Sequence, residues 1–227
     1  MVVNMTHTTR VGVATLLVCV HLCMSTSCSR GTDDTSAPAK NSNILRADGD
    51  ELVLDHATPA DLTSIHHAER YRVLDIEDAP LINDAEVKAI TRFAGVEELY
   101  LLRCGIGDAG VRAIADGMPR LTHLNLKKAP ISDAAFTHIA RISGLQGLCV
   151  YECSAVTDDG IARLSGLQSL WLLSCNDCPG VTCRSIDVFV GMKALRRLYV
   201  SRTGLTRADV DELMARRPGL EIEFLEE

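Results

Sequence analysis

A pattern of apolar residues recurs along most of this chain. The frame is apolar-x-x-Leu-x-Leu, with Ile or Val replacing some leucines, and its copies follow one another at similar intervals. Within each copy the alternation predicts a short strand with one buried face, because successive side chains of a strand point to opposite sides. The copies begin at Tyr71, Val96, Leu121, Leu145, Leu167 and Leu195, and a truncated copy begins at Leu220.

Each predicted strand is followed by a second pattern. A small residue stands three positions after the frame, and then a residue of the kind that caps helices. Apolar pairs spaced i, i+3 follow, which predicts a short helix with one buried face. The small residues are Ala79, Cys104, Ala129, Cys153, Cys175 and Thr203. The capping residues are Asn83, Gly107, Ser132, Thr157, Thr182 and Thr206. The apolar pairs are Val87/Ile90, Val111/Ile114, Phe136/Ile139, Ile161/Leu164, Ile186/Phe189 and Val210/Leu213.

This combination resembles the leucine-rich repeat family over residues 71–227. The resemblance implies an α/β fold, a right-handed βα solenoid of about six repeats with a parallel sheet on its concave face and helices on its convex face. Copies such as Cys153–Asp158 look like the cysteine-containing subclass, which is best known from F-box substrate adaptors. No F-box precedes the repeats, and residues 44–70 are expected to form an N-terminal cap.

Residues 1–28 have the organisation of a secretory signal. Arg10 precedes an apolar run, Val11–Met24, which is too short to span a bilayer. Ser25–Cys28 resembles a bacterial lipoprotein box, which implies cleavage before Cys28 and its lipidation. Ser25 stands where that pattern usually has Leu, Val or Ile, so an ordinary cleavage nearby is the alternative. Residues 29–43 are polar and contain Gly and Pro, and they are expected to form a flexible linker.

Charge excludes two classes of partner. The 227 residues carry 23 Lys and Arg against 30 Asp and Glu, a net charge of −7, and none of the acids lies before Asp33. Such an acidic chain has no basic surface for nucleic acid or for an anionic membrane face. We therefore expect a lipid anchor to be its only contact with a membrane.

No pattern of residues indicates catalysis, a metal or a cofactor. Gly105–Gly110 has the spacing G-x-G-x-x-G of a dinucleotide-binding loop. Neighbouring copies hold Pro130–Ala135 and Ala155–Gly160 in the same slots, so the repeat explains the glycines better. His56, His66 and His67 are expected to be solvated surface residues. We predict a protein without enzymatic activity, metal or cofactor.

The predicted concave face carries most of the chain's few aromatic residues. Aromatics are 4% of the sequence, yet three of the four tyrosines and the single tryptophan fall at outward positions of the predicted strands. Exposed Trp and Tyr are frequent energetic anchors of protein interfaces. The alternative is that neighbouring residues cover some of them. The predicted protein-binding residues are Tyr100, Leu102, Tyr151, Trp171, Leu173 and Tyr199.

Two cysteines, Cys178 and Cys183, lie at the one turn that this frame makes longer than the others, Asn176–Gly180. In an oxidising compartment a disulfide between them is expected to stabilise the turn. The alternative is that the thiols stay reduced and that Cys104, Cys153 and Cys175 fill the interior as small apolar groups.

These observations predict a monomeric, non-enzymatic leucine-rich repeat protein that binds a protein partner through its concave face. It is expected to be exported and anchored by lipid in a bacterial cell envelope, or free in the periplasm. The alternative is an intracellular F-box-like substrate-recognition adaptor, in which the leader stays as an unprocessed N-terminus.

Overall fold

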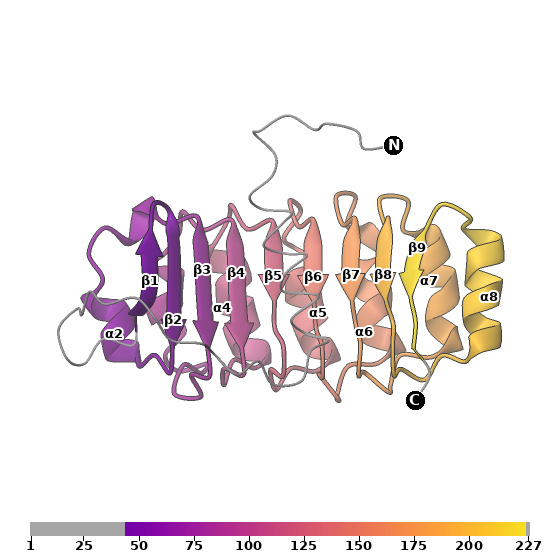
Figure 1. The fold of residues 1–227 in the computed structure, drawn as a ribbon, viewed down its shortest axis with the longest axis horizontal. Helices are drawn as coiled ribbons and strands as arrows, with labels where there is room; N and C mark the ends of the chain where they lie inside the picture. The colour runs from indigo at the N-terminus through magenta and orange to yellow at the C-terminus, as the bar shows by residue number, and fades with distance from the viewer. Residues whose placement is uncertain (1–43, 226–227) are drawn as a thin grey trace, which may run out of the picture. The chain divides into compact units, whose positions relative to one another are not determined.

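The computed structural model describes residues 44–225. Its strands form one sheet in which every strand lies beside its neighbours in sequence (Figure 1). β1 and β2 form an antiparallel hairpin, and every later pair of neighbours is parallel. The strands are β1 (Ile44–Asp48), β2 (Glu51–Asp55), β3 (Val73–Glu77), β4 (Glu98–Leu102), β5 (His123–Asn125), β6 (Gly147–Cys149), β7 (Leu172–Ser174), β8 (Arg197–Tyr199) and β9 (Glu221–Glu223).

The helices lie on one side of this sheet and connect successive parallel strands, as parallel pairing requires (Figure 1). This alternation confirms the predicted α/β solenoid of leucine-rich repeats. The α-helices are α2 (Pro59–Ser64), α3 (Lys88–Thr91), α4 (Asp108–Gly117), α5 (Asp133–Ile139), α6 (Asp158–Arg163), α7 (Ile186–Gly191) and α8 (Arg207–Arg216). The 3-10 helices are η1 (Ala68–Arg70), η2 (Leu164–Gly166) and η3 (Cys183–Ser185).

The core lies between the sheet and the helices. Strand leucines such as Leu74, Leu99 and Leu124 are at most 1% exposed, and all six predicted helical pairs are buried against them. Each fully buried leucine contributes about 1.5–3 kcal/mol relative to an exposed one. No single repeat encloses this surface, so neighbouring repeats stabilise one another.

The frame predicted for the fifth copy is wrong by three positions. Leu173 pairs in register with Leu148 on β6 and with Leu198 on β8, so this copy begins at Leu170 and not at Leu167. The copies beginning at Leu145, Leu170 and Leu195 are then evenly spaced along the chain. The sequence allowed both frames because this segment is rich in leucine, and only pairing with the adjacent strands selects one.

This correction moves two cysteines. Cys175 takes the last inward position of the frame, and Cys178 takes the small-residue slot that was predicted for Cys175. Cys178 is fully buried, and its thiol donates a hydrogen bond to the carbonyl of Val150 at 3.1 Å. The turn after it has the normal length for a repeat.

The predicted helix caps also link neighbouring repeats. Gly107, Ser132, Thr157, Thr182 and Thr206 each cap a helix as predicted. The exception is Asn83, because α3 begins only at Lys88. An aspartate that follows a cap accepts hydrogen bonds from the cap of the next repeat, in the pairs Asp108–Ser132, Asp133–Thr157 and Asp158–Thr182, with oxygen–oxygen distances of 2.6 Å.

Candidate protein-binding surface

Three rows of side chains point away from the helices. We call the surface that they form on β2–β9 the outer sheet face; it corresponds to the predicted concave face. The register of the strands aligns these side chains across the sheet. The first row is Glu51, Val73, Glu98, His123, Gly147, Leu172, Arg197 and Glu221. The second is Val53, Asp75, Tyr100, Asn125, Cys149, Ser174, Tyr199 and Glu223. The third includes Asp55, Glu77 and Leu102, and continues through Lys127, Tyr151 and Asn176.

Four of the six predicted binding residues lie in these rows, and two do not. Tyr100 and Tyr199 are in the second row, and Leu102 and Tyr151 are in the third. Leu173 is wrongly predicted: the corrected frame turns it into the core, where it is 0% exposed. Trp171 precedes β7 and is partly buried, with its ring edge-on to that of His123 and 6.5 Å between the ring centroids.

Neighbouring charged groups contact two tyrosines of the outer sheet face, Tyr100 and Tyr151. The Tyr100 hydroxyl donates to Glu98 Oε2 at 2.7 Å, and the Lys127 ammonium lies 4.5 Å from the centroid of the Tyr151 ring. Arg202 donates to the Tyr151 hydroxyl at 3.4 Å. Desolvation by burial, aided by nearby carboxylates, raises the pKa of Tyr151 to about 12.

The tyrosines are less exposed than their outward positions in the repeat pattern predict. Tyr100, Tyr151 and Tyr199 are 0%, 7% and 6% exposed. The alternative prediction, that neighbouring residues cover some of the aromatic side chains, therefore holds for these three tyrosines. Trp171 and Leu102 are partly exposed and are the predicted binding residues with the most accessible apolar surface.

A row of charged residues at the ends of the strands was not predicted. Each adopts a left-handed backbone conformation, with φ between 50° and 58°, directly before the small-residue slot. This conformation costs about 1–2 kcal/mol for a residue with a Cβ. Three ion pairs join neighbours along the row. The six residues form the pairs Asp78–Arg103, Lys128–Glu152 and Asp177–Arg202.

In two of these ion pairs an arginine makes two hydrogen bonds to the carboxylate. The Arg103 guanidinium donates two hydrogen bonds to Asp78 and thereby lowers the pKa of that carboxyl group. Arg202 binds Asp177 in the same two-pronged geometry. Once the fifth copy is placed in the corrected frame, the sequence shows a charged residue before each small-residue slot. The sequence alone does not show the pairing, because the partner lies in the next repeat of the chain.

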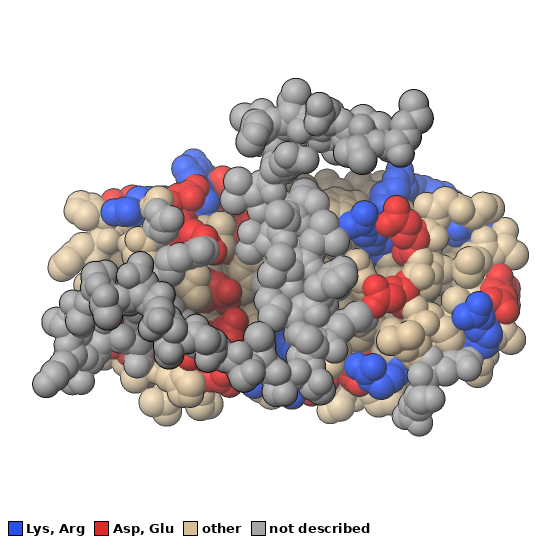
Figure 2. Space-filling view, in the orientation of Figure 1, with Lys and Arg blue, Asp and Glu red and all other residues tan. Residues whose placement is uncertain are grey.

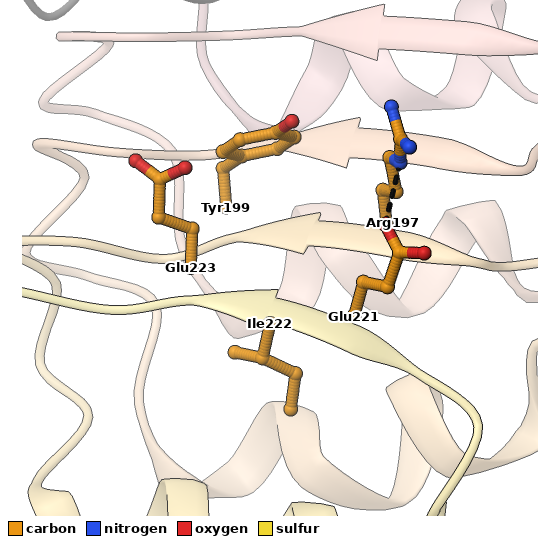
Figure 3. A pocket seen from close by; sticks show the side chains of 5 residues that line it. All are labelled: Arg197, Tyr199, Glu221, Ile222 and Glu223. Carbon is orange, nitrogen blue, oxygen red and sulfur yellow. Dashed lines mark hydrogen bonds and ion pairs between the residues drawn. The ribbon is translucent and has the colours of Figure 1, made fainter. Parts of the chain in front are cut away.

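A shallow hollow of about 220 Å³ lies at the C-terminal end of the sheet (Figure 3). Arg197 donates from Nε to Glu221 Oε2 at 2.7 Å on one side of it, and Tyr199 and Glu223 line the other side. Ile222 points away from these four side chains. The hollow is therefore lined by one aromatic ring and by positively and negatively charged side chains.

The predicted disulfide is not formed in this structure. Cys178 is buried and Cys183 is exposed at the start of η3, and both are free thiols. Burial raises the pKa of the Cys178 thiol to about 12. The other predicted cysteine site, Cys28, lies outside the described residues.

The glycines of the G-x-G-x-x-G motif serve the repeat itself. The amides of Gly107 and Gly110 donate to Asp84 Oδ1 at 2.7 and 2.9 Å, and a Cβ on Gly110 would lie 2.4 Å from that oxygen. Within residues 44–225, no group of three or more His, Cys, Asp or Glu side chains is arranged to hold a metal ion. Across that same range, no helix is long and apolar enough to cross a membrane.

Comparison with known proteins shows likeness in fold. No family model matches the chain, and no curated protein matches it. Similar solved structures include an internalin (inlF) from Listeria monocytogenes strain 4b F2365, with 15% identity and a TM-score of 0.53 over 78% of this chain and 47% of that one. Internalin C2 (inlC2) of the same strain has 20% identity and a TM-score of 0.52, covering 69% of this chain and 62% of its own. The chain thus spans less than two thirds of each of these proteins.

Proposed function

We propose that this chain is a non-enzymatic leucine-rich repeat module that binds a protein partner through its outer sheet face. The observation that carries the proposal is one continuous sheet face on which the partly exposed Leu102 and the largely buried Tyr151 and Tyr199 lie among charged residues. A sheet of this kind offers rigid side chains at fixed spacing, which lowers the entropy lost when a partner binds. The alternative of an F-box-like adaptor is not favoured by the comparisons.

The proposal includes export and a monomeric state. Residues 1–28 act as a signal peptide, with cleavage before Cys28 and its lipidation or, alternatively, an ordinary cut nearby. Residues 29–43 link the membrane to an N-terminal cap (44–70) and the repeats (71–227), which places the module in the cell envelope or periplasm. The sequence pattern of the leader supports this part. The intact mass of the mature protein from its native cell tests it: a full-length, unmodified chain would refute export.

Site-specific photocrosslinking tests the binding surface. A photoreactive phenylalanine derivative replaces Lys127, on the outer sheet face, and in a matched protein it replaces Arg112, which is exposed on the helix side in α4. After irradiation of native cells, we expect a crosslinked protein partner from position 127 and none from position 112. Equal crosslinking from both positions, or crosslinking from position 112 alone, contradicts the proposed surface.

A further inference from the structure

The sheet ends at β9 within the described residues. β9 pairs with β8 on one side, and no strand of residues 44–225 pairs with it on the other side (Figure 1). An edge strand presents main-chain N–H and C=O groups that lack sheet partners, and these groups are a template for pairing with another chain. The open side of β9 is therefore a surface that can accept one further strand.

Hydrogen bonding divides the residues of β9 between its two sides. The Glu221 amide and the carbonyls of Glu223 and Leu225 form hydrogen bonds of 2.9, 3.0 and 3.2 Å with residues that flank β8. The main-chain groups of successive residues in a strand point in opposite directions. Those of Ile222, and of Phe224 directly after β9, therefore point to the open side. Their spacing of about 7 Å is the one that a second extended chain shares.

The two faces of this edge differ in polarity. Ile222 and Phe224 are partly exposed and pack against the core on the helix side. On the outer sheet face the two glutamates of β9 line the hollow of Figure 3 together with Arg197 and Tyr199. In Figure 2 acidic and basic side chains occur together toward β8 and β9. A strand that alternates apolar and charged side chains matches both faces, because successive side chains of a strand point to opposite sides.

Glu223 determines which charge suits an added strand. Arg197 already pairs with Glu221 at 2.7 Å, whereas Glu223 forms no ion pair with a described residue. Glu223 is also partly buried, so salt screens its charge less than that of a fully exposed group. On a paired strand the side chain opposite Glu223 would have its Cβ about 5 Å away, which is within reach of a lysine or an arginine. The preferred side chain at that position is therefore basic.

We propose that an extended segment of a protein partner adds to β9 as the next strand of this sheet. The segment forms main-chain hydrogen bonds with Ile222 and Phe224 and places a lysine or arginine opposite Glu223. This contact goes beyond the proposed function, because it uses the edge of the sheet in addition to its outer face, and either contact can fail alone. A second copy of this chain fits less well, because full antiparallel overlap of two β9 strands places Glu221 opposite Glu223 twice.

Fluorescence anisotropy with the full chain tests this inference. The probe is a fluorescein-labelled heptapeptide in which lysine and valine alternate. The matched peptide has the same composition, with the lysines and the valines in separate blocks. We expect the alternating peptide to bind at about 1 mM or below and the block peptide to bind at least about tenfold more weakly, which corresponds to about 1.4 kcal/mol.

Two modified peptides separate strand pairing from simple charge attraction. One carries a methyl group on the main-chain nitrogens of the lysines, and the other on those of the valines. In an extended strand these two sets of amides point to opposite sides, so only one set faces β9. We expect one methylated peptide to bind at least about tenfold more weakly than the unmodified peptide, and the other to bind within about threefold of it. Loss with the lysine set indicates a strand parallel to β9, and loss with the valine set indicates an antiparallel one.

Substitutions in the chain test the same contact from the other side. Ile222→Pro removes an amide that points to the open edge, while the bonds to β8 are retained, and should weaken binding at least about tenfold. Its control, Ile222→Val, keeps the amide and should change binding less than about threefold. Glu223→Gln should weaken binding about threefold, whereas Glu86→Gln, at an exposed site before α3, should change it less than about 1.5-fold. If Ile222→Pro lowers the melting temperature, the methylated peptides with the wild-type protein decide the question.

Four results would overturn the inference. They are no binding of the alternating peptide at about 1 mM, equal binding of the block peptide, equal binding of the two methylated peptides, and self-association of the wild-type chain that Ile222→Pro abolishes. The last result, measured by sedimentation without peptide, would assign the edge to a second copy. Crosslinking from position 127 does not involve this edge, so its outcome in cells tests the proposed function separately.

Discussion

Asp158 offers the sharpest test of how neighbouring repeats hold one another. It is 7% exposed, and its carboxylate accepts hydrogen bonds from the Thr182 amide, the Thr182 hydroxyl and the Ser185 hydroxyl at 2.8, 2.6 and 2.5 Å. Ser185 is fully buried, so water does not replace the lost acceptor there. Asp158→Ala leaves these donors without their partner. At about 1–2 kcal/mol for each poorly hydrated donor, the free energy of unfolding should fall by about 3 kcal/mol.

The adjacent residue provides the control. Asp159 is exposed, and among the described residues its side chain makes only an ion pair with Arg184 at 3.5 Å, so Asp159→Ala should cost less than about 0.5 kcal/mol. Urea unfolding at pH 7, followed by circular dichroism, measures both variants. A loss below about 1 kcal/mol for Asp158→Ala, or equal losses for the two, would refute the role of the inter-repeat carboxylate.

The pH dependence of this loss gives an independent check. Burial raises the pKa of Asp158, but hydrogen bonds from Ser185 and Thr182 outweigh it, and the folded-state pKa lies below the ordinary value of 3.8. The unfolded state then binds the proton more readily. Stabilisation by Asp158 is therefore complete above about pH 4 and disappears as the pH falls through the folded-state pKa. The difference between wild type and Asp158→Ala should shrink in acid.

Three further predictions concern the core, the thiols and His123. Leu173→Ala should lower the free energy of unfolding by about 2–5 kcal/mol, whereas Leu102→Ala, at a partly exposed site, should cost less than half as much; equal losses in urea unfolding would contradict the corrected frame. Iodoacetamide should modify Cys183 in the native protein far faster than Cys153 or Cys178, whose pKa values burial raises to about 12; peptide mass spectrometry without reductant checks this, and a Cys183 that reacts only after reduction would favour the disulfide. Because burial lowers the pKa of His123 from 6.5 to about 4, the unfolded state binds its proton first, and stability should decrease by up to about 3 kcal/mol as the pH falls from 6.5 to 4. His123→Gln should flatten this slope, and an unchanged slope would exclude His123 as its cause.

The periodic pattern of the sequence determined the fold. Regularly recurring leucines, with a small residue and a helix cap in each copy, can bury their apolar side chains only by stacking. The positions of Tyr100, Tyr151 and Tyr199 on one sheet followed from the same pattern, because side chains alternate along a strand. These features are local, and each copy repeats the information of the others.

Only the tertiary structure decided the features that depend on contacts between repeats. Leucine at positions 167, 170, 172 and 173 allowed two frames, and pairing of β7 with β6 and β8 selected the one that buries Leu173. The pairing of Asp158 with Thr182 and the placement of His123 beside Glu98 join residues of successive repeats. The periodic pattern predicts which residue types recur in each copy. The three-dimensional register decides which side chains meet, because a hydrogen bond needs its donor and acceptor within about 3 Å of each other.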